Sequence, residues 1–154
     1  MMSRTRAQSP ARSRVIVLIA VGAAFMSGLD LFVVNVAFDQ IGVSLGVGTD
    51  GGPTIADMSW ILNIYAVVYA ALLVPLGRIA DRYGRKTVFV GGLALFVAAS
   101  AACALSGNVW MLVLFRGLQA AGAASMTPTS LSILMAALPP EKRIGGVRMW
   151  SATG

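Results

Sequence analysis

The chain has 154 residues, of which 57% are hydrophobic and 12% are charged, whereas a soluble domain has about 25% charged residues. It has no histidine and one cysteine, which leaves no cluster with metal-ligand spacing and no internal disulfide. The net charge of +6 comes from short basic clusters between apolar runs. That pattern favours anionic lipid headgroups and argues against nucleic acid as a partner. We therefore expect an integral membrane protein that is embedded in the lipid bilayer.

Four apolar segments are long enough, or nearly so, to cross a bilayer as a helix, which takes ~20 residues. In chain order they cover about residues 15–38, 58–78, 87–106 and 109–138. A cleaved signal sequence is disfavoured because the first apolar run continues past its small residues and three more segments follow. Pro128 lies inside the fourth segment, and we expect a kink there. The sequence thus predicts an all-α fold, a polytopic bundle of transmembrane helices.

The remaining segments are polar. Residues 1–14 predict a basic N-terminal tail, and residues 139–154 predict a linker and the start of a truncated fifth helix. Four basic residues precede the first segment, Arg78 ends the second and three more follow it before the third, and three follow the fourth. The connections 39–59 and 106–108 contain no lysine or arginine. By the positive-inside rule we expect a multi-pass protein of the plasma membrane with its N-terminus in the cytoplasm.

Two ionisable residues lie within the apolar segments. Asp30 is about eight residues from the outer end of the first, and Arg116 is about seven from the outer start of the fourth, or ~12 and ~10 Å deep at the helical rise. Each charge is costly in hydrocarbon without a partner or water. If the two helices touch, the residues can pair. A fixed structural ion pair and a proton-coupling site both remain open interpretations.

Two amides and a run of small residues accompany this pair. Gln119 lies three residues after Arg116 and shares its helix face. Asn35 lies five residues after Asp30, ~140° around the helix. We expect Asn35 to face a different neighbour and to hydrogen-bond between helices, with substrate contact as its second possible role. Small side chains predict close packing of the fourth helix, and they occur at Gly117, Ala121, Gly122, Ala124 and Ser125.

The connection 77–86 has a pattern of its own. Gly77 and Gly84 are predicted to bracket a tight cytoplasmic turn, because glycine permits close backbone approach. Asp81 is a lone acid among four basic residues, and we expect it to cap a helix start or to pair with Arg85. A plain positively charged loop is the simpler alternative, but such a loop does not require two glycines around a central acid.

Three stretches resemble motifs of the major facilitator superfamily. Residues 77–86 are similar to its signature G-x-L-A-D-R-x-G-R-K, with Ile79 in place of leucine. Residues 112–124 resemble L-x-x-x-R-x-x-Q-G-x-G-A-A, the fourth-helix motif of its drug/proton antiporters, with Ala120 in place of glycine. Residues 29–41 resemble L-D-x-T-I-V-N-V-A-L-P-x-I, from the first helix of the fourteen-helix antiporter branch. Phe32 and Asp39 replace threonine and proline there.

The resemblance implies the first four helices of an incomplete N-terminal bundle in a rocker-switch transporter. It implies proton-coupled efflux of drugs or other small molecules, hydrophobic or cationic, driven by a proton gradient without a cofactor. Two sets of residues carry these roles. The proton-coupling and transport set is Asp30, Asn35, Arg116 and Gln119, and the gating loop against the second bundle is Gly77, Asp81, Arg82, Gly84, Arg85 and Lys86.

Four helices cannot enclose a pathway between two bundles, so we expect the chain to be the N-terminal part of a longer protein whose C-terminal bundle is a missing partner. One alternative is a complete small four-helix protein, acting as an oligomeric multidrug pump or as a non-transporting assembly partner. An enzyme is not expected, because no nucleophile, histidine or metal cluster is arranged for catalysis.

The predicted topology can be tested by cysteine labelling in whole cells. Single cysteines at Ser3, Thr49 and Thr87 are introduced in a Cys103→Ala background and exposed to a membrane-impermeant thiol reagent. Only the Thr49 position should react, because it lies in the outer connection that contains no basic residue. Labelling at Ser3 without labelling at Thr49 would reverse the orientation.

Overall fold

A computed structural model describes the backbone of residues 10–153 and the side chains of residues 15–152. The described part consists of helices and short connections and contains no β-strand, which confirms the predicted all-α class. Its elements are α1 (Pro10–Ser44), α2 (Ile55–Tyr83), α3 (Arg85–Ala104), α4 (Val109–Ala137) and α5 (Pro140–Thr153).

Four helices are long and apolar enough to cross a membrane: Val15–Ser44, Ile55–Tyr83, Arg85–Ala104 and Val109–Ala137. The helices extend beyond the predicted apolar segments. α1 begins at Pro10, inside the predicted tail, and continues to Ser44, while α2 continues to Tyr83. A helix satisfies its own backbone groups in the interface as well as in hydrocarbon, so its polar end turns stay helical where hydropathy alone ends the segment. Proline also suits the first turn of a helix.

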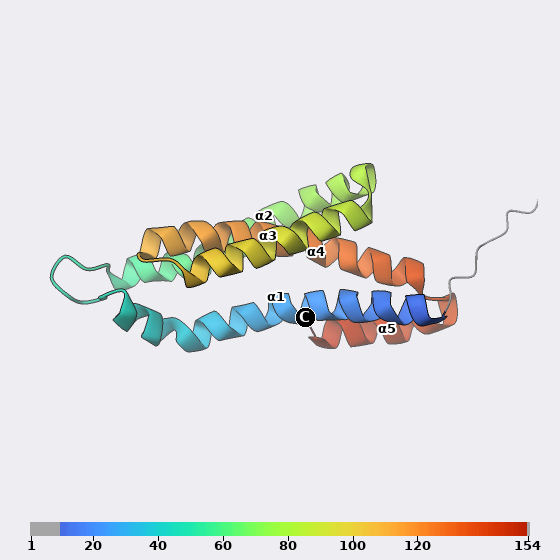
Figure 1. Cartoon of the computed structure of the whole chain (residues 1–154), viewed down its shortest axis with the longest axis horizontal. Coiled ribbons are helices and arrows are strands. Elements are labelled where there is room, and N and C mark those ends of the chain that lie inside the picture. The colour runs from blue at the N-terminus through green and yellow to red at the C-terminus, as the bar shows by residue number, and fades with distance from the viewer. Residues whose placement is uncertain (1–9, 154) are drawn as a thin grey trace, which may run out of the picture.

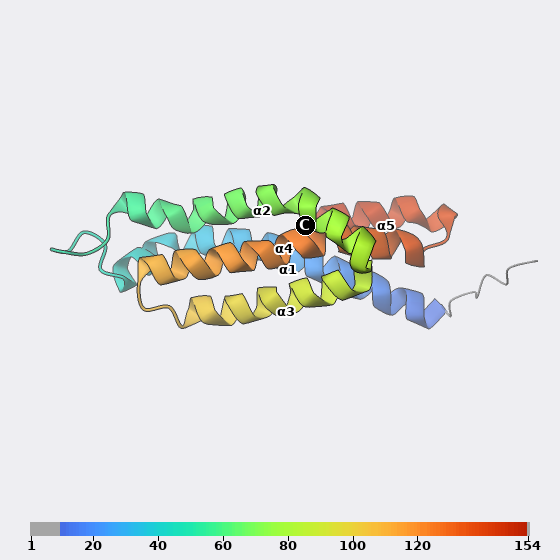
Figure 2. The same ribbon diagram turned by 90° about the horizontal axis from the view of Figure 1, so that it is seen from above.

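The helices run alongside one another, with their connections gathered at two ends (Figures 1 and 2). The connections 45–54 and 105–108 lie at one end, here called the loop end. The α2–α3 connection, the start of α1 and the start of α5 lie at the other, here called the basic end (Figure 1). α4 lies between α2 and α3 in Figure 2 and also contacts α1 and α5, so it is the centre of the bundle.

Side-chain caps define the helix starts at the loop end. Thr54 caps α2: its hydroxyl accepts from the Asp57 backbone N–H at 3.2 Å, and Asp57 Oδ2 accepts from the Thr54 backbone N–H at 2.9 Å. Asn108 caps α4 by accepting from the Met111 N–H at 2.8 Å. Such caps satisfy backbone donors that a helix start otherwise leaves without partners. α2 and α4 therefore start at defined residues.

The α2–α3 connection is tighter than predicted. α2 continues through Gly77 to Tyr83, and Gly84 alone separates it from α3, with a φ of 98° that favours glycine. The expectation that Gly77 and Gly84 bracket a turn is therefore wrong for Gly77. A Cβ at Gly77 would lie 3.8 Å from the Pro128 side chain, an ordinary contact, so neither backbone nor packing requires glycine there. α4 continues through Pro128, and the kink remains a prediction.

Close packing of α3 on α4 depends on small residues. A Cβ at Gly122 would lie 2.7 Å from the Phe96 backbone nitrogen and 2.8 Å from the Gly92 carbonyl oxygen. A Cβ at Gly92 would lie 3.0 Å from the Gly122 carbonyl oxygen. These distances leave no room for a side chain, since the opposing atoms belong to backbone. The predicted packing role of the small residues is confirmed at Gly122, and Gly92 is its partner.

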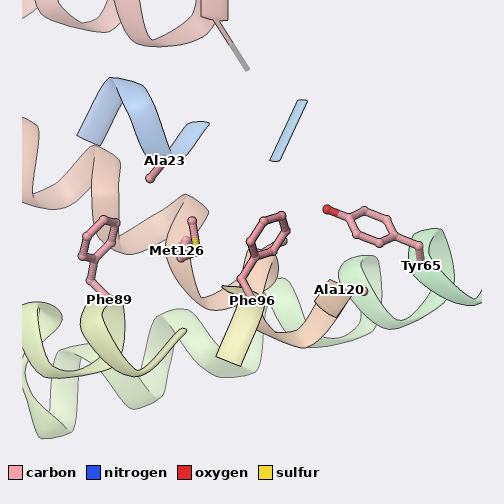
Figure 3. Close-up of a cluster of buried hydrophobic side chains, with 7 residues drawn as sticks. Ala23, Tyr65, Phe89, Phe96, Ala120 and Met126 are labelled. Carbon is pink, nitrogen blue, oxygen red and sulfur yellow. The ribbon is translucent and has the colours of Figure 1, made fainter. Parts of the chain in front are cut away.

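Two apolar clusters occupy the two halves of the bundle. The inner cluster, toward the basic end, is shown in Figure 3: Phe89 and Phe96 of α3 lie in a row with Tyr65 of α2, while α1 and α4 contribute smaller side chains. Its buried members are Ala23, Tyr65, Phe89, Phe96, Ala120, Ala123 and Met126. The outer cluster, toward the loop end, consists of Met58, Ile61, Val109, Leu112 and Val113.

Substitution of Gly122 tests the packing. Gly122→Ala places a methyl group against the α3 backbone and should lower the free energy of unfolding in detergent by about 1–3 kcal/mol. The matched control is Gly91→Ala, at an exposed position of the same helix α3 that carries Gly92, where a Cβ meets nothing within 4 Å. This control should be neutral or stabilising by roughly 0.5–1 kcal/mol, because alanine favours the helix. Equal effects of the two substitutions would show that close approach at Gly122 is unimportant.

Candidate functional site

Asp30 of α1 and Arg116 of α4 meet between the two apolar clusters. Arg116 Nη1 lies 2.5 Å from Asp30 Oδ2, and the side chains are 2% and 16% exposed. The depth estimate from the sequence brought the two residues to the same level, and the structure confirms that they pair. An ion pair removed from water is strong only when its remaining hydrogen-bonding atoms are also satisfied.

Gln119 supplies most of those additional hydrogen bonds. Its Nε2 donates to Asp30 Oδ1 at 2.7 Å and to Ser100 Oγ of α3 at 2.6 Å, and its Oε1 accepts from Arg116 Nη1 at 2.7 Å. Both carboxylate oxygens of Asp30 therefore have a donor. Gln119 bridges three helices because its position one turn after Arg116 places it on the same face of α4.

Tyr65 and Ile61 of α2 complete the surroundings of the guanidinium. Arg116 Nε donates to the Ile61 carbonyl oxygen at 3.5 Å, and the guanidinium carbon lies 4.4 Å from the centre of the Tyr65 ring, a cation–π contact. Two atoms stay without a hydrogen-bond partner among the described residues, Arg116 Nη2 and Tyr65 Oη. Buried polar atoms are nearly always satisfied, so each of them has capacity for one more ligand.

Ser100 and Tyr65 were not identified from the sequence. Each carried a weak signal. Ser100 is a polar residue in an otherwise apolar segment. Tyr65 lies in the middle of its segment, whereas membrane tyrosines gather at the interface. Neither signal names the partner, because that depends on how the helices are rotated.

Asn35 does not join the site. Its Nδ2 donates to the Leu31 carbonyl oxygen of the same helix at 2.7 Å, and its side chain is exposed. The expected hydrogen bond between helices is therefore wrong. Asparagine can bond to the carbonyl one turn earlier, and its position around α1 points it away from Asp30 and α4. A contact between Asn35 and a substrate remains untested.

The gating residues form a second group at the basic end. Asp81 accepts from Arg85 Nη2 at 3.0 Å and from Nε at 3.1 Å, so the pair predicted from the sequence is confirmed and the alternative role as a helix cap is not. The N-cap of α3 is Gly84, which makes no side-chain cap. Arg82 lies over the Tyr83 ring at 5.5 Å. These residues are exposed, as is Lys86. Gly77 lies about one turn before Asp81 in α2.

The chemistry of the buried site is narrow. Arginine stays protonated in proteins, and glutamine and serine do not change charge near neutral pH. Asp30 is therefore the member of this network that can gain or lose a proton. Within residues 10–153 no three histidine, cysteine or acidic side chains are grouped to hold a metal ion. The arrangement places one carboxylate next to a permanent positive charge.

Comparisons with known proteins point to one family. The profile of the Major Facilitator Superfamily matches residues 20–154. The chain is 37% identical to the methylenomycin A resistance protein of Bacillus subtilis over 147 residues, 94% of this chain and 30% of the relative. It is 35% identical to the multidrug resistance protein Stp of Mycobacterium tuberculosis, covering 92% of this chain and 26% of Stp.

A third relative is the probable multidrug resistance protein EmrY of Escherichia coli, at 35% identity over 85% of this chain and 24% of EmrY. The chain thus spans about a quarter to a third of the length of these relatives. The resemblance noted in three motifs extends over nearly all of the chain, and the expectation of a transport protein rather than an enzyme is confirmed. The chain belongs to the major facilitator superfamily.

Proposed function

We propose that this chain forms the first helices of a proton-coupled exporter of drugs or other small molecules. The observation that carries the proposal is the buried network of Asp30, Arg116, Gln119 and Ser100, which contains one group that can change charge. A structural ion pair does not need to lie halfway across a membrane. A charged residue at that depth marks an ion or proton pathway more often than a structural contact.

Protonation of Asp30 would change how α1 is held. The deprotonated carboxylate attracts Arg116 and accepts from Gln119, and both residues belong to α4. A neutral carboxyl group loses the ionic attraction, while Arg116 keeps its contacts with Ile61, Tyr65 and Gln119. Proton binding to Asp30 therefore weakens the contact between α1 and α4. Gradient-driven transport needs such a coupling between proton binding and helix position.

A second bundle completes the proposed transporter. The relatives are three to four times as long as this chain, and α1 exposes large apolar side chains such as Phe32 and Val36 at 73% and 84%. We propose that a C-terminal bundle covers part of this face and that substrate passes between the bundles. The names of the relatives, among them a tetracenomycin C resistance and export protein of Streptomyces glaucescens, support drugs as substrates. The hydrophobic or cationic character of the substrates is proposed from the motif resemblance alone. The plasma membrane, with the basic end in the cytoplasm, is the proposed location.

We propose that the residues around Gly84 act as the cytoplasmic gate. Asp81 and Arg85 are both about half-exposed, so their ion pair is open to exchange with groups of a facing bundle. Solvent weakens exposed pairs, which lets such partners change during a transport cycle. Gly77, Arg82, Gly84 and Lys86 lie in the same part of the chain and belong to the gate by resemblance.

The gate is tested by Asp81→Asn in the full-length transporter that contains these residues. The substitution removes the partner of Arg85 and should reduce export of a fluorescent lipophilic cation about tenfold, while membrane insertion stays normal because the pair contributes little to stability. Glu141→Gln is the matched control, since it removes an exposed acid at the same end and should leave export unchanged. Normal export by Asp81→Asn would rule out the gating role and support the alternative of a plain positively charged loop.

Proton coupling is tested with Asp30→Asn, Arg116→Lys and the double variant Asp30→Asn/Arg116→Gln. Export driven by an imposed pH gradient is measured in proteoliposomes. Asp30→Asn should abolish gradient-driven export and retain substrate binding, because asparagine keeps the shape but cannot titrate. Arg116→Lys should also fail, because an ammonium lacks the planar fork of a guanidinium. Asp39→Asn, an exposed acid of the same helix, is the control and should be active.

The double variant separates the two interpretations of the pair. Loss of one partner leaves a buried charge and costs about 3–5 kcal/mol, whereas loss of both can be nearly neutral. A purely structural pair therefore predicts that the double variant regains both folding and gradient-driven export. Our proposal predicts that it regains folding but not export. Restored export by the double variant would rule out the proton-coupling role of Asp30.

A further inference from the structure

A cavity of about 430 Å³ connects the buried site with the loop end of the bundle. Asp30, Arg116, Gln119 and Ser100 line its deep part, and Ser44 at the end of α1 and Ser106 in the 105–108 connection line its other end. Since 14 residues separate Asp30 from Ser44 along α1, the cavity extends ~20 Å along the helix. The connections 45–54 and 105–108, which lie at this end of the cavity, are next to each other in Figure 1.

Polar side chains line the two ends of the cavity, and apolar ones such as Val34, Ile41 and Leu112 line it between them. Ser44 and Ser106 donate their hydroxyl hydrogens to carbonyl oxygens of their own segments, Ile41 and Cys103, which leaves their oxygen lone pairs free to accept. At the deep end, Asp30 is 16% exposed and lines the cavity beside Gln119 and Ser100. A water needs polar partners and about 30 Å³, so the cavity has room and partners for several.

The other side of the site is closed by apolar side chains. Toward the basic end, the inner cluster packs between α1, α2, α3 and α4, and each of its buried members is at most 5% exposed. A second cavity of about 370 Å³ lies beyond it and reaches Phe89. Figure 3 shows Phe89 and Met126 near Ala23 of α1, with Phe96 on the far side of Met126. A packed apolar constriction excludes water and ions. Asp30 therefore has a cavity on one side and packed apolar side chains on the other.

We propose that this cavity is a water-filled vestibule through which protons reach Asp30 from the loop end, within the bundle rather than between two bundles. The inner cluster prevents the same protons from passing to the basic end in this conformation. The inference rests on the proposed proton coupling for its purpose, but the vestibule itself is a property of the described helices and can be measured without transport.

The native Cys103, the chain's one cysteine, is half-buried and lines the vestibule between its mouth and Ser100. A membrane-impermeant sulfonatoethyl methanethiosulfonate is added to whole cells or to inside-out vesicles. The thiolate attacks the reagent's sulfenyl sulfur, forms a disulfide and releases methanesulfinate. Thr49→Cys and Thr87→Cys in a Cys103→Ala chain mark the loop end and the basic end. Cys103 should react in the preparation in which Thr49→Cys reacts.

The floor of the vestibule is tested at two adjacent positions of α3. Ser100→Cys lies at the floor, whereas Ala99→Cys, the matched control, is buried and outside the cavity lining. Both are made in the Cys103→Ala chain. Ser100→Cys should react at least roughly tenfold faster than Ala99→Cys, because the reaction requires aqueous access to the thiol. Equal rates would show that water stops short of Asp30 and would overturn the proposal.

Blocking the mouth gives a further check that leaves the native cysteine in place. Ala104→Phe fills the vestibule, whereas Ala101→Phe adds the same ring to an exposed position of α3 outside the lining. Only Ala104→Phe should slow the modification of Cys103, by about tenfold. Cys103 reaction from the basic end, or reaction no faster than at Ala99→Cys, overturns the vestibule. If Cys103 reacts fast and Asp30→Asn still shows gradient-driven export, the vestibule is supported and proton coupling through Asp30 is ruled out.

Discussion

The position of α1 depends on the charge pair between Asp30 and Arg116. Neither residue is stable alone at this depth, since a charged side chain in the middle of a bilayer costs ~2.5–3.5 kcal/mol even on the mildest scale. Arg116 is held on α4 by contacts with α2, through the Ile61 carbonyl and the Tyr65 ring. Asp30 is the contribution of α1. Gln119 then ties this pair to Ser100 of α3, so four helices meet at one set of polar contacts.

Sequence reasoning found this pair because helical rise is regular. Counting residues from the loop end placed Asp30 and Arg116 at the same depth, and the position of Gln119 one turn after Arg116 fixed its face. Residues whose roles depend on helix rotation were missed. Ser100 and Tyr65 join the site only because α3 and α2 turn those faces toward α4, and Asn35 fails to join because it lies on another side of α1.

Glycine was a weaker guide than charge. At Gly84 the backbone needs a positive φ, so the residue and the helix break coincide. Gly77, in the same motif, lies within α2 and meets no steric limit. The close approach at Gly122 could be expected from a run of small residues, but its partner Gly92 depends on the register of α3 against α4. A glycine in a sequence shows what the backbone is free to do, and only the neighbouring helix decides whether that freedom is used.

The packing differs on the two sides of the pair, and this difference favours α1 as the element that moves. α4 approaches α3 so closely that a single methyl group at Gly122 meets backbone atoms, so a sliding motion between these two helices is obstructed. α1 has no comparable backbone contact with α2 or α3, and several of its large side chains are exposed. Its polar attachment to α4 is the Asp30 carboxylate. In the proposed mechanism, a proton at Asp30 weakens the polar attachment of α1 to α4, while α2, α3 and α4 keep their contacts with one another. The proposed coupling then acts on the position of a single helix rather than on the stability of the whole bundle.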